Sequence, residues 1–146
     1  MTTALNSEQV AKKIGDVSPG VVVAADKTAV VVTSESLLKV AEFLKNTPEL
    51  DFNYLADLTT VDYMDYFEVV YHLVSLTHNH SLVLKTRCHD RDKAVVPSVT
   101  SLWRSAYYME REAHDLMGII FHGHPNLQRL LLWEGFVGHP LRRDYL

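Results

Sequence analysis

The residues best suited to chemistry lie in one C-terminal stretch, from Tyr107 to Tyr145. Half of the histidines fall here, and the tripeptide Gly-His-Pro occurs in it twice. Glu110 and His114 are four residues apart, so a helix would place both on one face, and His122 and His124 follow further along the chain. Imidazole and carboxylate groups are common zinc ligands. These four residues therefore raise one hypothesis, a stand-alone metal-dependent enzyme.

The same stretch lacks the motifs of a complete catalytic centre. It contains neither the His-Glu-x-x-His zinc motif nor the Gly-x-Ser-x-Gly nucleophile turn, and the chain has no phosphate-binding glycine motif. Glu110 and Glu112 are two residues apart and point to different helix faces, which disfavours an acid/base pair. The single cysteine, Cys88, excludes an internal disulfide and any iron–sulfur or zinc site built on cysteines of this chain. We therefore expect no catalytic residue, bound cofactor or metal here.

The charge pattern indicates a protein partner rather than nucleic acid. The formal net charge is −4, whereas nucleic-acid binding requires a basic surface. After Lys93 every basic residue is an arginine, whose planar guanidinium suits bidentate pairing with carboxylates. This switch from lysine to arginine favours a C-terminal half that faces another protein. The alternative is a chance difference in residue usage.

The apolar runs of the chain are short. The N-terminus has no basic leader before an apolar segment, and no apolar run reaches the length of a membrane span. We therefore expect a soluble intracellular protein that could still dock on a membrane complex.

Hydrophobic periodicity predicts one α+β domain, a largely antiparallel sheet with helices packed on it. The expected helices span residues 7–14, 34–46, 97–106 and 109–118, with Gly15, Pro48 and Gly118 as stop signals. The expected strands span residues 21–24, 29–32, 52–63, 67–77 and 82–87. Four carboxylates near the longer strands (Asp57, Asp62, Asp65 and Glu68) are interpreted as solvated loop and edge residues, not as metal ligands.

Residues 119–146 are expected to form a separate docking segment after an α+β domain of residues 1–118. This irregular segment holds large apolar side chains but too many glycines and prolines for one long element. Such a segment is poorly suited to forming its own core and well suited to lying extended over another protein. The alternative is that it wraps its own sheet.

The C-terminal stretch resembles the signature of a known family. Its first half reads Glu-Arg-Glu-x-x-Asp-Leu-x-Gly-Ile-x-Phe-x-Gly-His-Pro-Asn-Leu from Glu110, and its second half reads Gly-Phe-x-Gly-His-Pro-Leu-Arg-Arg-Asp from Gly135. This pattern is similar to that of the 30 kDa subunit of respiratory complex I, known in bacteria as the C subunit of the proton-translocating NADH-quinone oxidoreductase. Met117 and Gln128 depart from the pattern, which usually has an aromatic residue and an arginine at these positions.

The resemblance implies a non-catalytic scaffold subunit in the hydrophilic arm of a complex I-like quinone oxidoreductase. In the family this subunit packs against the 49 kDa-type quinone-site subunit and near iron–sulfur subunits, so the iron–sulfur clusters and quinone belong to its partners. It would support electron transport to quinone, coupled to proton transport, from a peripheral position on the cytoplasmic face, or its equivalent, of an energy-transducing membrane. It would meet the membrane only through the complex. An assembly factor that leaves the finished complex is the alternative.

The residues that carry the resemblance are expected to make or brace the subunit interface. They are Glu110, Arg111, Glu112, Asp115, Gly118, His124, Pro125, Arg129, Gly138, His139, Pro140, Arg142 and Arg143. The charged members would make the contacts with the partner or brace them, and the glycines and prolines would set the path of the chain.

Overall fold

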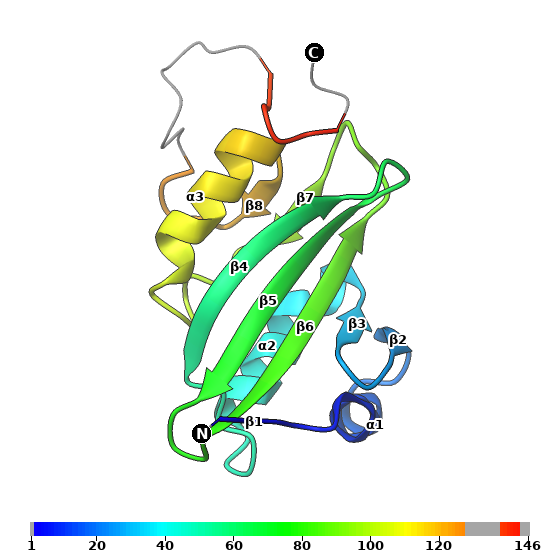
Figure 1. The fold of residues 1–146 in the computed structure, drawn as a ribbon, viewed down its shortest axis with the longest axis vertical. Coiled ribbons are helices and arrows are strands. Elements are labelled where there is room, and N and C mark those ends of the chain that lie inside the picture. The colour runs from blue at the N-terminus through cyan, green and yellow to red at the C-terminus, as the bar shows by residue number, and fades with distance from the viewer. Residues whose placement is uncertain (1, 128–137, 144–146) are drawn as a thin grey trace.

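The computed structural model describes residues 2–127 and 138–143, and it confirms an α+β fold with a largely antiparallel sheet (Figure 1). The strands are β1 (Thr3–Ala4), β2 (Val22–Ala25), β3 (Val30–Val32), β4 (Tyr54–Asp62), β5 (Phe67–Ser75), β6 (His80–Cys88), β7 (Val95–Pro97) and β8 (Ile120–His122). The helices are α1 (Ser7–Val17), the short 3-10 helix η1 (Ser34–Ser36), α2 (Leu37–Asn46) and α3 (Ala106–Met117). The main sheet has the order β2-β3-β6-β5-β4, with β1 also paired to β6, and β7 and β8 form a second small sheet.

The long strands β4, β5 and β6 form an antiparallel meander. In β6 every second side chain is buried, which is the pattern of a strand with one face on the core. Strands β5 and β6 stay in register along their whole length, from Phe67 opposite Cys88 to Ser75 opposite His80. The short strands β1 and β3 both join β6 in parallel. The meander therefore makes the sheet largely antiparallel.

Helices α1 and α2 each bury one apolar stripe in the core of the domain. The buried apolar residues are Val10, Ala11 and Ile14 in α1, and Leu37, Val40, Ala41 and Leu44 in α2. Their spacing of three or four residues places them on one face of each helix. They share this core with the sheet residues Leu73 and Leu84. In Figure 1, α2 lies behind strands β5 and β6, and α3 packs beside β4.

The predicted end of the first helix at Gly15 was wrong. Helix α1 begins after Asn6, whose side chain accepts a hydrogen bond from the Glu8 N–H, and it continues through Gly15 to Val17. A glycine inside a helix costs only about 1 kcal/mol relative to alanine. The packing of Ile14 and its neighbours in the core outweighs that cost.

The predicted helix from Pro97 to Ala106 was also wrong. Pro97 ends strand β7, which pairs in parallel with β8, and Val96 is fully buried opposite Phe121. Turns follow, and α3 begins only at Ala106. Val99 and Trp103, which suggested a helical stripe, are buried in this irregular segment instead.

The C-terminal end of α3 lies where the sequence predicted it, at Gly118. This glycine adopts the left-handed conformation, with φ of 78°, that commonly ends a helix. The chain then enters β8, and both Ile119 and Phe121 are buried in the core. Residues 119–122 therefore belong to the fold itself, although the sequence analysis assigned them to the docking segment.

Candidate docking site at the end of helix α3

Residues 138–143, called the C-terminal turn below, return to the end of α3. A helix leaves its last carbonyl groups without intrahelical partners, and this turn supplies them. The contacts are His139 Nδ1 to the Asp115 carbonyl at 3.1 Å, the Leu141 N–H to the Leu116 carbonyl at 3.0 Å, and Arg142 Nε to the Met117 carbonyl at 2.7 Å. Since a carbonyl only accepts, His139 donates from Nδ1. The turn thus caps the helix.

Gly118 allows the C-terminal turn to approach the helix this closely. A Cβ atom at position 118 would lie 2.5 Å from Nη2 of Arg142 and 2.7 Å from Cδ2 of His139. Both distances are far shorter than van der Waals contact. A Cβ at this position would force the Arg142 and His139 side chains out of their contacts with the helix end, in addition to straining the backbone.

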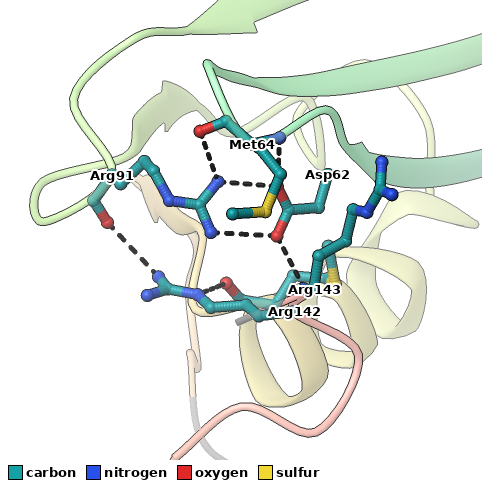
Figure 2. A network of polar contacts seen from close by, with 6 residues as sticks. Asp62, Met64, Arg91, Arg142 and Arg143 are labelled. Atoms are coloured by element: carbon teal, nitrogen blue, oxygen red, sulfur yellow. Dashed lines mark hydrogen bonds and ion pairs between the residues drawn. The ribbon is translucent and has the colours of Figure 1, made fainter. Parts of the chain in front are cut away.

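Arg142 holds the turn through its guanidinium group. Beyond its bond to the helix end, it donates to the Arg91 carbonyl at 3.4 Å (Figure 2). Its guanidinium carbon lies 4.9 Å from the centre of the Phe67 ring, within the range of a cation–π contact. A positive group is also stabilised at the negative end of a helix dipole. Arg142 therefore braces the domain itself.

Asp62 joins the end of β4 to the turn. Its carboxylate accepts two hydrogen bonds from Arg91, at 2.6 and 2.9 Å, and one each from the backbone N–H groups of Met64 and Arg143, both at 2.8 Å (Figure 2). The hydrogen bonds from Arg91 are the largest cause that holds the pKa of Asp62 well below its ordinary value of 3.8. The group is therefore a buried, fully ionised anchor.

The interpretation of the acidic residues as solvated was wrong for Asp62 and Glu68. Both are buried, and Glu68 pairs with Lys85 at 3.3 Å and with Arg87 at 3.0 Å. The register of β5 against β6 places Glu68 opposite Arg87, whereas Asp62 is paired by Arg91 from the loop after β6. The other two carboxylates, Asp57 and Asp65, are exposed as expected.

Glu110 lies inside the domain and braces the turn that precedes α3. It is fully buried and accepts hydrogen bonds from the Ser98 hydroxyl at 2.6 Å and the Val99 N–H at 2.8 Å. Burial raises its pKa to about 7, against the lowering effect of these two donors. Asp115 is also fully buried. Neither carboxylate is presented on the surface of this chain.

The remaining predicted interface residues are more open to solvent. Arg111 is half-buried, with its guanidinium near the rings of Tyr107 and Tyr108, whereas Glu112 and Pro125 are exposed. Nε2 of His124 lies 2.9 Å from the Tyr107 carbonyl. Gly138 and Pro140 are half-buried in the turn, and the side chain of Arg143 is exposed. Arg129 lies outside the described residues.

The four residues of the metal hypothesis do not converge. His114 bonds to the Ile119 carbonyl at 2.9 Å, and Glu110 is engaged with the segment before α3. Across residues 2–127 and 138–143 no three histidine, cysteine or acidic side chains are arranged to hold a metal ion. The metal-dependent enzyme is therefore not favoured.

In residues 2–127 and 138–143 no helix is long and apolar enough to cross a membrane.

The fold and this site define an α+β domain whose C-terminal turn is clasped to the end of its last helix. Residues 30–146 match the family described as the 30 kDa subunit of respiratory-chain NADH dehydrogenase. The chain belongs to this family.

A curated relative and two solved structures agree with this assignment. The C subunit of NADH-quinone oxidoreductase from Roseiflexus sp. (strain RS-1) is 48% identical over 119 residues, which cover 80% of this chain and 68% of the relative. A trypsin-resistant fragment of Nqo5 is 35% identical, with a TM-score of 0.57 over 67% of this chain and 80% of that one. A chain of the membrane-bound sulfane sulfur reductase, an archaeal respiratory membrane complex, is 25% identical, with a TM-score of 0.71 over 94% and 84% of the two chains.

Proposed function

We propose that the chain is a non-catalytic docking subunit of a complex I-like quinone oxidoreductase. Family membership supports this role, together with a relative named as the C subunit of NADH-quinone oxidoreductase and a similar chain within a respiratory membrane complex. The protein would hold the quinone-site subunit of the 49 kDa type against the iron–sulfur subunits, on the cytoplasmic face or its equivalent. The clusters and the quinone would then reside in these partners.

The clasped C-terminal turn is the observation that carries the docking role. The turn is fixed to its own domain through backbone groups and Arg142, while the side chains of Leu141 and Arg143 remain exposed. In Figure 2 the contact drawn between Arg143 and Asp62 is made by the Arg143 backbone N–H, and the Arg143 guanidinium lies on the opposite side of Asp62 from Arg91. Because the backbone of the turn is already fixed, it loses less conformational entropy when a partner arrives. Arg143 is therefore suited to contacting a partner's carboxylate.

Arg143→Glu tests this role without disturbing the fold. The variant should keep the melting temperature of the parent chain, because the side chain is exposed and its anchoring hydrogen bond is made by the backbone. We expect its retention in the purified membrane complex to fall at least tenfold. Arg104→Glu, at another exposed arginine, is the matched control and should be retained normally. Equal retention of the two variants would contradict the assignment of Arg143 to the interface.

A further inference from the structure

A groove of about 210 Å³ lies between α3 and β4, beside the C-terminal turn. Its lining is formed by Leu58, Thr59 and Thr60 of β4, by Met109, Glu112, Ala113, Leu116 and Met117 of α3, and by Leu141 of the turn. Most of these side chains are apolar, and Glu112 is the one charged residue among those described in the lining. The groove is therefore shaped for an apolar side chain with a positive charge next to it.

The residues around the groove have the character of an interface. Leu141 is 60% exposed and Tyr108 is 61% exposed, and aromatic and methionine side chains are enriched where proteins meet. Tyr108 and Glu112 are four residues apart on α3 and so share one face of the helix. The Leu141 N–H is bonded to the Leu116 carbonyl, which fixes this leucine beside the groove.

One polar group in the groove also lacks a partner. The hydroxyl of Thr60 is buried and makes no hydrogen bond in the described structure. Buried polar groups are normally paired. This hydroxyl is already covered within the chain, so it is a polar gap in the β4 wall and not a contact offered to an occupant.

We propose that this groove receives an aliphatic side chain of a neighbouring, non-identical protein subunit, next to a lysine or arginine that pairs with Glu112. The inference rests on the proposed function, because it gives the chemistry of the partner surface. A second copy of this chain fits less well. In a two-fold pairing of this face with itself, each Glu112 would meet another acidic groove, and like charges across an interface repel.

Two substitutions at the groove test the proposal in the assembled complex. Leu141→Glu and Glu112→Arg should each lower retention of the full chain in the purified membrane complex at least tenfold. Their matched controls are Leu76→Glu, at a leucine that is 68% exposed in the β5–β6 turn, and Glu42→Arg, at an exposed glutamate of α2. All four isolated variants should keep the parent melting temperature, because all four side chains are exposed.

Cross-linking identifies the occupant of the groove. A photoreactive phenylalanine analogue in place of Tyr108 should form an adduct with a different subunit, in a peptide that contains an aliphatic residue and a lysine or arginine. Reversing that basic residue to glutamate should restore retention of Glu112→Arg. Adducts between two copies of this chain, or normal retention of both groove variants, would overturn the groove proposal alone. Absence of the parent chain and controls from the complex would overturn the proposed function as well.

Discussion

Gly118→Ala is expected to lower the free energy of unfolding by about 3 kcal/mol, one of the two largest effects for a single substitution in this chain. The left-handed backbone at Gly118 is strained for any residue with a Cβ, and the added atom would overlap Arg142 and His139. The C-terminal turn would then withdraw from the end of α3 and leave its carbonyls uncapped. Urea denaturation measures the loss as a lower midpoint with an unchanged slope.

Gly123→Ala separates the backbone strain from the lost contacts. Gly123 also has a positive φ, of 88°, but a Cβ there would meet nothing within 4 Å. Its substitution should cost only about 1 kcal/mol, the usual penalty of the left-handed conformation. Equal losses in the two variants would show that the turn does not pack on Gly118.

Asp62→Asn is expected to lower the free energy of unfolding by a similar amount, about 3 kcal/mol, because removing one partner of a buried ion pair leaves the other uncompensated. The side chain of Asp62 is 1% exposed and that of Arg91 is 21% exposed. Asparagine keeps an acceptor for one backbone N–H but loses the paired contact with Arg91. Asp90→Asn is the control, because Asp90 is exposed and bonds only to backbone groups of its own loop in the described contacts. Its effect should stay within about 0.5 kcal/mol.

The same substitution should change the acid stability of the protein. Because the pKa of Asp62 is lowered in the folded state, its stabilising effect is present above the ordinary value of 3.8 and is lost as the pH falls through the folded-state pKa. The difference in the free energy of unfolding between the parent and Asp62→Asn should therefore shrink in this acidic range. A difference that stays constant down to low pH would contradict an ionised Asp62.

Glu110 affects stability in a different pH range. Its raised pKa of about 7 makes the free energy of unfolding fall as the pH rises from its ordinary pKa of 4.5 toward 7.

The parts of the fold that could be predicted are those with local signals. Strand β6 shows the alternation of buried residues expected of a strand, and β5 is a run of aromatic and β-branched residues buried on both faces over most of its length. The end of α3 follows from a glycine after an apolar stripe. Pro97 misled the prediction because proline at a helix start and proline at the end of a short strand look alike in sequence. What decides between them is the pairing of β7 with β8, which joins residues far apart in the chain.

The candidate site could be located from the sequence, but the roles of its residues could not. Among the described residues of the motif, Gly118, His139 and Arg142 meet at the end of α3, whereas Glu110 is buried against the segment before the helix. Arg142 bonds to the domain's own carbonyls. Sequence analysis also interpreted Asp62 as solvated and missed its partner Arg91, because the two residues come from different elements. Two basic residues in a row, Arg142 and Arg143, look equivalent in sequence. Only the backbone geometry shows that one faces inward and the other outward.

The copy number of this chain in the finished complex tests the central claim most directly. Quantitative mass spectrometry of the membrane complex, purified and washed at high salt, should find one copy of the chain for each quinone-site subunit. A chain that is absent from the mature particle would be an assembly factor instead, and a purified chain with stoichiometric zinc or iron would be the metal-dependent enzyme. Either result would contradict a permanent, non-catalytic docking subunit.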